Sequence, residues 1–528
     1  MAWDSIRLEY SSEIPVMAPT TLNNDIYDTI LEGLDKRKDV TSFMLSSKLF
    51  YSLGFDRLLR MGVLLENDQQ MVSFCSSMKR CFLDVAKNAG QLRDLAISIK
   101  PPMESSRKRW TLQGAPFLIP VLGCLTNLRN LEISYCESLL CCDDQLVEAF
   151  AALTTLQVLR ISGFGQKTHS MVATLRSHLR AAHIDCIYHT SASPAHSDGP
   201  CIADTLFMLR EHQNTLEQAD IRIGDAITWS RKQELHTANY VFPHVHELRL
   251  TGCCGFNGGR KAMEIAFPNV RRLYLHWENA PEAIQEEESR PRLDNDDGSR
   301  NMVEPNPWEK LEHVCADVDS LYVHALKCSV DRLDVTFWDF KDLDNVDIGH
   351  LCTSLKDMRP RRLVLRWDKF DVDEHEACTL LKSYVEQLLN GLEQPAINAM
   401  THIGLDFGIT SFQVDIQAHQ YMDAFSLLLD SLPRVRFFSV RLRQDAQLTA
   451  EQNVTHEVYS DSASSNEELS AWVAQRAAAS QSLEFLSFTV LDRPAYRRIS
   501  RGRSQLLQVD VDRPNDGMRH VAAEGMLM

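Results

Sequence analysis

The sequence predicts an α/β solenoid, in which irregular repeats build a curved parallel sheet with outer helices, capped by a small N-terminal all-α module. Three segments share the frame L-x-x-L-x-I-S, at Leu92–Ser98, Leu128–Ser134 and Leu156–Ser162. Two others share F-P-x-V-x-x-L-x-L, at Phe242–Leu250 and Phe267–Leu275, and begin 25 residues apart. Identical frames separated by helix-like stretches are typical of repeat architectures.

The composition is that of a folded protein with an acidic balance. The chain has 528 residues, of which 44% are hydrophobic, and its formal net charge is −17. This apolar content supports a sizeable core and excludes wholesale disorder. The negative charge argues against binding to nucleic acids or anionic membranes, which require a basic surface.

Each frame predicts a short strand, because its apolar positions alternate along the chain. Looser copies lie at Leu216–Ile221, Val330–Val335, Arg361–Arg366, Met400–Leu405, Val435–Val440 and Leu483–Phe488, with a weaker one at Leu311–Ala316. Helix-like stretches such as Asp144–Leu153 and Asp423–Asp430 lie between them. L-x-x-L-x-L resembles the strand signature of leucine-rich repeats, although the spacing here is irregular. An ordinary α/β domain with parallel strands is the alternative, but no doubly wound nucleotide signature accompanies the frames.

The N-terminal segment has a helical period. Leu22, Ile26, Ile30 and Leu34 lie four residues apart and form one apolar stripe. The charged stretch Asp35–Asp39 ends this helix, and a second apolar stripe begins at Val40. We therefore expect a module of short helices before the first repeat.

This module resembles an F-box. The pattern L-[P]-x-[DE]-I-x-x-x-I-[LF]-x-x-L, followed by D-[LV] and [SC]-[KR]-x-[LF], is represented by Leu22, Asp25, Ile26, Ile30, Leu31, Leu34, Asp39, Val40, Ser47, Lys48 and Phe50. Asn23 replaces the usual proline. An F-box followed by irregular repeats resembles the F-box/leucine-rich-repeat proteins of fungi.

The resemblance implies a role in ubiquitin transfer. In that family the F-box docks on a Skp-type adaptor of a cullin–RING ubiquitin ligase, and the repeats hold the substrate protein. By analogy, the apolar side chains that form the adaptor-binding surface and the module core are Leu22, Ile26, Ile30, Leu34 and Val40. The alternative is a plain helical cap, which repeat arrays need at their ends.

The chain divides into four parts with one internal insertion. We expect an N-terminal tail at 1–20, the F-box-like module at 21–65, the solenoid at 66–492, and a C-terminal hairpin and tail at 493–528. Residues 281–307 are acidic and contain three prolines, which predicts a mobile insertion.

The motifs of enzymes and metal sites are incomplete. Gly252–Lys261 departs from a phosphate-binding loop, because Ala262 follows the lysine where a hydroxyl residue is needed. Cys136, Cys141 and Cys142 lack the paired C-x-x-C spacing of zinc sites. We therefore predict no catalytic residues, no cofactor and no metal, and hence no enzyme; a site assembled from distant residues is the remaining enzymatic alternative.

The concave face offers a candidate binding surface. In a leucine-rich repeat, that face is built from residues that flank the last apolar position of each strand. The predicted substrate-binding residues are Arg160, Arg222, Arg249, Tyr274, His276, Arg366 and Arg441. Together with Glu132, Asp220, Asp334 and Asp406, they give five arginines against four acids. This favours a mildly basic groove for an acidic or phosphorylated peptide; the alternative is a solvated face whose charges neutralise one another.

The expected location is the cytoplasm, the nucleus or both. The first ten residues contain no basic segment followed by an apolar stretch, and 14 scattered cysteines are typical of reduced thiols. The predicted function is therefore substrate recognition for an SCF-type ubiquitin ligase. The alternative is a protein-interaction scaffold without any link to ubiquitin.

Overall fold

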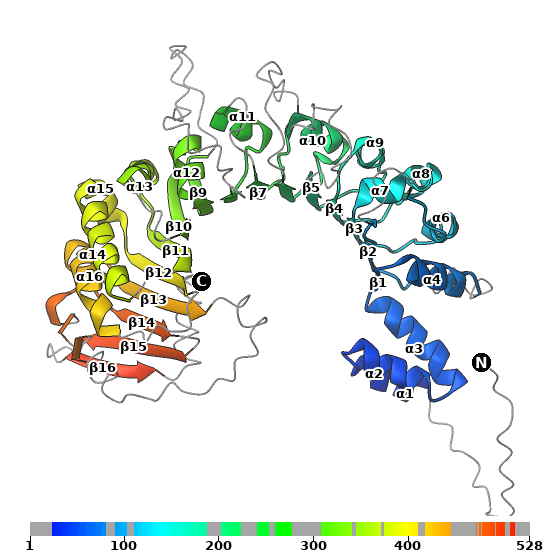
Figure 1. The fold of residues 1–528 in the computed structure, drawn as a ribbon, viewed down its shortest axis with the longest axis horizontal. Coiled ribbons are helices and arrows are strands. Elements are labelled where there is room, and N and C mark those ends of the chain that lie inside the picture. Colours follow the sequence, from blue (N-terminus) through cyan, green and yellow to red (C-terminus); the bar gives the residue numbers. More distant parts are fainter. Residues whose placement is uncertain are drawn as a thin grey trace, which may run out of the picture.

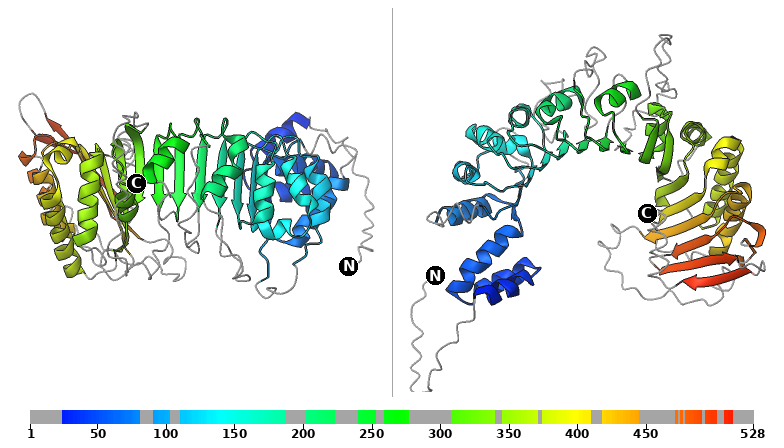
Figure 2. Two further views of the ribbon diagram at one scale, coloured as in Figure 1. Left: turned by 90° about the horizontal axis from the view of Figure 1, so that it is seen from above. Right: turned by 180° about the vertical axis from the view of Figure 1, so that it is seen from behind.

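The strands form one curved sheet in chain order, from β1 to β16. The computed structural model describes residues 24–80, 90–102, 110–186, 202–222, 240–252, 259–276, 308–339, 345–370, 374–409, 418–444, 471–472, 475–476, 478–490, 493–501 and 507–512. The sheet is parallel up to β14, and β15 and β16 are antiparallel additions. Strands line the inside of an arch and helices cover its outside (Figure 1). Figure 2 shows the same band of strands from above and from behind.

The strands of the N-terminal half are short. They are β1 (Val63–Leu65), β2 (Asp94–Ser98), β3 (Asn130–Ser134), β4 (Val158–Ser162), β5 (Ala181–Asp185), β6 (Gln218–Arg222), β7 (Glu247–Thr251) and β8 (Arg272–His276). Those of the C-terminal half are β9 (Lys310–Asp317), β10 (Ser329–Asp339), β11 (Arg362–Phe370), β12 (His402–Ile409), β13 (Phe437–Gln444), β14 (Phe485–Val490), β15 (Arg493–Arg501) and β16 (Leu507–Asp512).

The helices of the N-terminal half begin with α1 (Asn24–Glu32), α2 (Arg37–Met44) and α3 (Lys48–Arg60), which precede the sheet. The outer layer continues with α4 (Asp68–Arg80), α6 (Ala115–Leu122), α7 (Cys136–Leu140), α8 (Gln145–Ala151), α9 (Gln166–Ala173), α10 (Ile202–Met208), the 3₁₀ turn η2 (Arg210–His212) and α11 (Gly259–Ala266). The helices of the C-terminal half are α12 (Val318–His324), α13 (Asn345–Met358), α14 (Glu374–Gly391), α15 (Gln394–Ala399) and α16 (Ala418–Ser431). Among the described residues, no helix is both long and apolar enough to cross a membrane.

The leucine frame explains the curved parallel sheet. In β3, Leu131 and Ile133 are buried, whereas Glu132 between them is exposed on the concave side. Leu128, which precedes the strand, is fully buried beneath the turn. The prediction of an α/β fold with a curved parallel sheet is confirmed, because each frame forms a strand beside the next.

Two strands were missed by the sequence patterns. β5 follows the frame Leu179-x-x-Ala182-x-Ile184, in which alanine replaces the central leucine, and it divides the long interval between the frames at Leu156 and Leu216. β1 lacks the first leucine of the frame. In the register with β2, Arg60 occupies the position that corresponds to Leu92. The sheet therefore begins at Val63, before the expected boundary of the solenoid at residue 66.

An aromatic stack joins the longer strands of the C-terminal half. Phe337, Trp367 and Phe407 occupy matching positions of β10, β11 and β12. Their rings are parallel within 12°, with centroids 5.2 and 4.6 Å apart, and all three are buried. In-register stacking of this kind contributes about 0.5–1.5 kcal/mol per pair beyond burial. The stack therefore supports the register of β10, β11 and β12.

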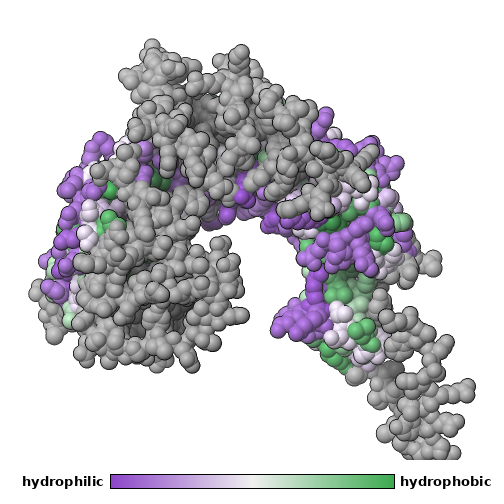
Figure 3. All heavy atoms as spheres, viewed as in Figure 1, coloured by the Kyte–Doolittle hydropathy of each residue, from purple (hydrophilic) through white to green (hydrophobic). Residues whose placement is uncertain are grey.

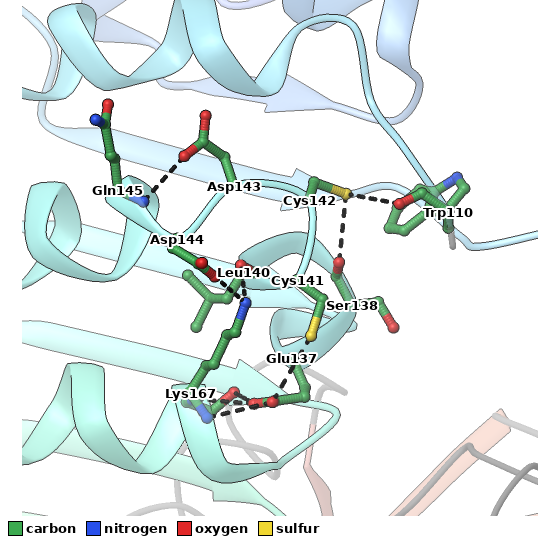
Figure 4. A network of polar contacts seen from close by, with 11 residues as sticks. Trp110, Glu137, Ser138, Leu140, Cys141, Cys142, Asp143, Asp144, Gln145 and Lys167 are labelled. Atoms are coloured by element: carbon green, nitrogen blue, oxygen red, sulfur yellow. Dashed lines mark hydrogen bonds and ion pairs between the residues drawn. The ribbon is translucent and has the colours of Figure 1, made fainter. Parts of the chain in front are cut away.

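A carboxylate joins successive repeats in the outer layer. Gly165 precedes α9 and offers no side chain to cap it. Glu137 of α7 takes over this role: it accepts a hydrogen bond from the backbone N–H group of Lys167 at 3.2 Å (Figure 4). It also accepts one from the backbone N–H group of Thr168 at 2.9 Å. Two free N–H groups of the first helical turn are thereby satisfied from the previous repeat.

The cysteines beside Glu137 are free thiols. Cys136 is fully buried, and burial raises the pKa of its thiol to about 12. The thiol of Cys142 donates to the carbonyl oxygens of Ser138, at 3.4 Å, and Trp110, at 3.6 Å (Figure 4). The two hydrogen bonds of Cys142 therefore lie within the outer helical layer, at the turn that follows α7.

The acidic stretch 281–307, expected to be a mobile insertion, lies outside the described residues. The side chain of Ala262, in the glycine-rich segment, also lies outside them. At the other end, β15 and β16 pair as an antiparallel hairpin in which Tyr496 lies opposite Asp512. The hairpin adds to the edge formed by β14.

Candidate functional site: the concave face and the N-terminal module

The concave face carries rows of side chains that run across the strands. We define the central row by the residues that share one register, which are Ala96, Glu132, Arg160, His183, Asp220, Arg249, Tyr274, Cys315 and Asp334. A second row, two residues further along each strand, contains Asp185, Arg222, Thr251 and His276. Figure 3 shows hydrophilic residues along this inner side of the arch.

All seven predicted substrate-binding residues lie on these rows. Arg160, Arg249 and Tyr274 belong to the central row, and Arg222, His276, Arg366 and Arg441 to the second row. The fold brings Arg249, Tyr274 and His276 together on β7 and β8. It separates them from Arg366 and Arg441, which flank Asp406 on β11, β12 and β13.

The first part of the face is a shallow depression over β3–β6. Its volume is about 230 Å³, and Glu132, Arg160, His183 and Asp220 are among its lining residues. His183 Nδ1 lies 3.1 Å from Asp220 Oδ2. Arg160 is exposed and makes no ion pair with any described residue. It is therefore the cation of this depression best placed to meet an anionic group.

The central part is a chain of contacts around Tyr274. The guanidinium carbon of Arg249 lies 4.3 Å above the Tyr274 ring, and its Nη2 donates to Glu247 at 2.9 Å. The imidazole of His313 makes an edge contact with the same ring, with centroids 5.4 Å apart and planes at 81°. Arg249 is therefore fixed by a carboxylate and an aromatic face at once, a geometry that suits arginine but not lysine.

A buried carboxylate completes this chain. Asp334 is 5% exposed and receives two hydrogen bonds of 2.7 Å from Arg332. Burial alone would raise the pKa of Asp334, but the imidazole of His313, whose Nε2 lies 3.3 Å from Oδ2, and the hydrogen bonds from Arg332 outweigh it and hold that pKa below its usual value. Asp334 is therefore ionised at neutral pH and anchors two basic side chains of the face.

The arginines of the concave face are mostly neutralised in place. Arg249 pairs with Glu247, Arg222 lies 3.8 Å from Asp185, and Arg366 Nε lies 3.2 Å from Asp406 Oδ2. These three ion pairs favour the alternative interpretation, in which the charges of the concave face neutralise one another. The sequence patterns missed Asp185 and His183, because β5 itself was not predicted, and they missed Glu247 because it begins its strand.

One thiol and one imidazole approach each other on this face. Cys315 Sγ lies 3.9 Å from His276 Nε2, on the adjacent strands β9 and β8. Burial, with a further contribution from Asp334, raises the pKa of the Cys315 thiol to about 12. Since the thiolate is the nucleophilic form of cysteine, this thiol is a poor nucleophile at neutral pH.

The N-terminal module is a separate cluster of three helices at one tip of the arch (Figure 1). Its buried core consists of Leu31, Val40 and Met44. Ser47 caps α3 by accepting a hydrogen bond from the backbone N–H of Phe50 at 3.1 Å. The side chain of Arg57 in α3 donates to the backbone oxygen of Leu34, at 3.3 Å, and so ties α3 to the end of α1.

The five predicted adaptor-binding residues have different environments. Ile26 and Ile30 are 45% and 44% exposed on α1, whereas Leu34 is half-buried. Val40 is fully buried, so it supports the core of the module and has no exposed surface for a partner. Leu22 lies outside the described residues. Of the predicted adaptor-binding residues, Ile26 and Ile30 are therefore the exposed pair among those described. Figure 3 shows hydrophobic residues on the surface of this module.

No protein-family model matches this chain, and no curated protein matches it. The functional assignment therefore depends on the geometry of the described residues.

Proposed function

We propose that this protein is the substrate-recognition subunit of an SCF-type cullin–RING ubiquitin ligase. In this proposal the N-terminal module, which resembles an F-box, docks on a Skp-type adaptor, and the concave face binds the substrate protein. The protein itself contributes proximity and orientation, while other subunits carry out the chemistry. Such a complex operates in the cytoplasm or the nucleus.

The observation that carries the proposal is the exposed pair Ile26 and Ile30. The adjacent Leu31 is 2% exposed, so α1 already directs an apolar side chain into the core of the module. The two isoleucines lie on an exposed stripe of the same helix, four residues apart and about one helical turn from each other. Large apolar side chains grouped on a small module are typical of a protein–protein interface.

A plain cap explains this surface less well. The terminal units of a repeat array need a polar outer face for solubility. Here the outer face of α1 carries two isoleucines, and Leu45 at the end of α2 is 80% exposed. Fully burying an isoleucine side chain is worth about 1.5–3 kcal/mol, so a partner that covers these residues gains a useful part of its affinity from them.

The concave face suits the second half of the proposal. Its rows present ionised and hydrogen-bonding groups from consecutive strands, and the pairs that involve Arg249 and Asp334 hold them in fixed orientations. A surface of this kind recognises an extended protein segment by polar complementarity. Among its cations, Arg160 supports an acidic or phosphorylated substrate, because it is exposed and makes no ion pair with any described residue.

A binding assay with the purified adaptor tests the proposal. The assay compares the full chain, a version that lacks residues 1–60, and the double substitution Ile26→Asp and Ile30→Asp. Ile265→Asp is the matched control, because Ile265 is 47% exposed on α11 at a distance from the module. We expect the full chain and the control to capture the adaptor and the other two to fail, with circular dichroism unchanged for the point variants. Failure of the full chain would favour the scaffold function without a ubiquitin link.

A further inference from the structure

Three potential metal ligands converge in the outer layer, away from both surfaces described above. Asp319 lies at the start of α12, and Asp347 and His350 lie in the first turns of α13. One ligand atom from each side chain lies within 4.8 Å of the other two. In the described part of the chain, no other group of three His, Cys, Asp or Glu residues converges in this way. Figure 1 shows α12 and α13 as neighbours on the outside of the arch.

The fold fixes the positions of all three residues. Asp347 and His350 are three residues apart, so they lie on the same face of α13. Asp317 begins α12 by accepting a hydrogen bond from the backbone N–H of Ser320 at 2.8 Å, which places Asp319 in the first turn. The ligands therefore come from two successive repeats that pack side by side.

The imidazole of His350 is held in a defined orientation. Its ring stacks on Tyr322 of α12, with centroids 3.6 Å apart and planes within 15°. Its Nδ1 lies 3.5 Å from Asp319 Oδ1, is inaccessible to solvent, and makes no hydrogen bond with any described residue. A buried ring nitrogen that makes no hydrogen bond and lies 3.5 Å from a carboxylate oxygen has a geometry that a metal ion between the two atoms would satisfy.

The spacing agrees with coordination of a small divalent ion. Zn²⁺ binds histidine nitrogen at about 2.0–2.1 Å and carboxylate oxygen at about 2.0–2.2 Å. In a tetrahedral site such bonds place two ligand atoms about 3.4 Å apart, close to the 3.5 Å between His350 Nδ1 and Asp319 Oδ1. Because the side chain of Asp319 is 54% exposed, it can rotate and bring its carboxylate closer to that of Asp347, the third ligand.

We propose that Asp319, Asp347 and His350 bind one divalent transition-metal ion of the Zn²⁺ class, with solvent at the remaining coordination position. Imidazole nitrogen selects Zn²⁺ and similar ions over Mg²⁺ and Ca²⁺, which prefer oxygen ligands alone. The ion would also relieve the repulsion between the two carboxylates and join α12 to α13. This site goes beyond the proposed role in ubiquitin transfer and does not depend on it.

Zinc titration of the full chain tests this site. Because the chain has 18 histidines, the decisive quantity is the difference between variants, measured as bound Zn²⁺ per chain after equilibrium dialysis. The test variants are Asp347→Asn and His350→Gln, and the exposed His178→Gln is the matched control. We expect the wild type and the control to bind one more Zn²⁺ than either variant, with at least about tenfold weaker affinity at this site in the variants.

A second variant and a second probe separate loss of the site from loss of folding. Asp319→Asn changes an exposed side chain and should remove the site without altering the circular dichroism spectrum. With Co²⁺ in place of Zn²⁺, visible absorption bands should appear in the wild type and disappear in all three variants. Equal zinc stoichiometry and equal cobalt spectra in the wild type and the variants would overturn the proposal.

Discussion

Ile30 and Leu31 are consecutive residues of α1 with opposite environments: Ile30 is 44% exposed, whereas Leu31 is 2% exposed in the core of the module. One helix thus supplies both the packing that holds the module together and the apolar surface available to a partner. This division allows folding and binding to be tested by different substitutions in the same helix.

Leu31→Ala should unfold the N-terminal module locally. Removing a buried leucine costs about 2–5 kcal/mol, and a terminal unit of a repeat array contacts few neighbours that can compensate. Hydrogen–deuterium exchange should show faster exchange in residues 24–60 and unchanged protection in β6–β12. Ile30→Ala is the matched control and should leave protection unchanged, because its side chain contacts solvent. Equal protection in both variants would mean that the core is not where the structure places it.

Glu137→Ala should destabilise the junction between α7 and α9. The substitution removes the acceptor for the backbone N–H groups of Lys167 and Thr168, and loss of a helix cap costs about 0.5–2 kcal/mol. Chemical denaturation measures this loss. Glu137→Gln retains one acceptor oxygen and should therefore lose less stability; an equal loss in both variants would contradict the capping role.

His324 should make the protein sensitive to mild acid. The imidazole is 2% exposed at the end of α12, and burial lowers its pKa from 6.5 to about 4. Between these two pH values the unfolded chain binds a proton that the folded chain does not. Stability should therefore fall as the pH drops from about 6.5 to about 4, by about 3 kcal/mol in total at 1.36 kcal/mol per pKa unit.

Urea unfolding at several pH values measures this effect. His324→Leu should flatten the dependence of the unfolding free energy on pH in that window. Leu321→Ala is the matched control, because it removes a buried side chain from the same helix but keeps the imidazole. The control should be less stable at every pH and retain the slope of the wild type. An unchanged slope in His324→Leu would show that other groups cause the acid sensitivity.

Arg160→Glu should weaken the binding of acidic or phosphorylated peptides. Arg160 is exposed within the depression over β3–β6, and an arginine there can form charge-assisted hydrogen bonds to oxyanions. An immobilised array of phosphorylated peptides measures the effect at low and physiological salt, with a loss of about tenfold expected. Arg176→Glu, on the outer layer, is the matched control. Equal binding by both variants would favour the self-neutralising interpretation of the concave face.

Much of the fold follows from the leucine frames, because each identical frame alternates buried and exposed side chains along a strand. β1 and β5 escaped this pattern, since Arg60 and Ala182 occupy positions where leucine carries the signal. Pairing with neighbouring strands completes both of them, and such pairing is not visible in a local pattern.

The candidate surfaces were predictable in part. The positions of the concave arginines follow from the strand frame, but their carboxylate partners Asp185 and Glu247 depend on register between strands. The helical stripe of α1 predicts its apolar face, but only packing separates the exposed Ile26 from the buried Leu31. The cluster around His350 joins Asp319 to Asp347, which are 28 residues apart in sequence, a spacing that no linear motif describes.

The central claim is that α1 docks on a Skp-type adaptor through Ile26 and Ile30, and an equilibrium titration with the purified adaptor tests it most directly. The titration compares the wild type, the double substitution Ile26→Asp and Ile30→Asp, and the control Ile265→Asp. We expect the double substitution to weaken binding at least about a hundredfold, or about 2.7 kcal/mol, at unchanged thermal stability. The control should bind like the wild type. Equal affinity in all three proteins, or no binding by the wild type, would contradict the claim.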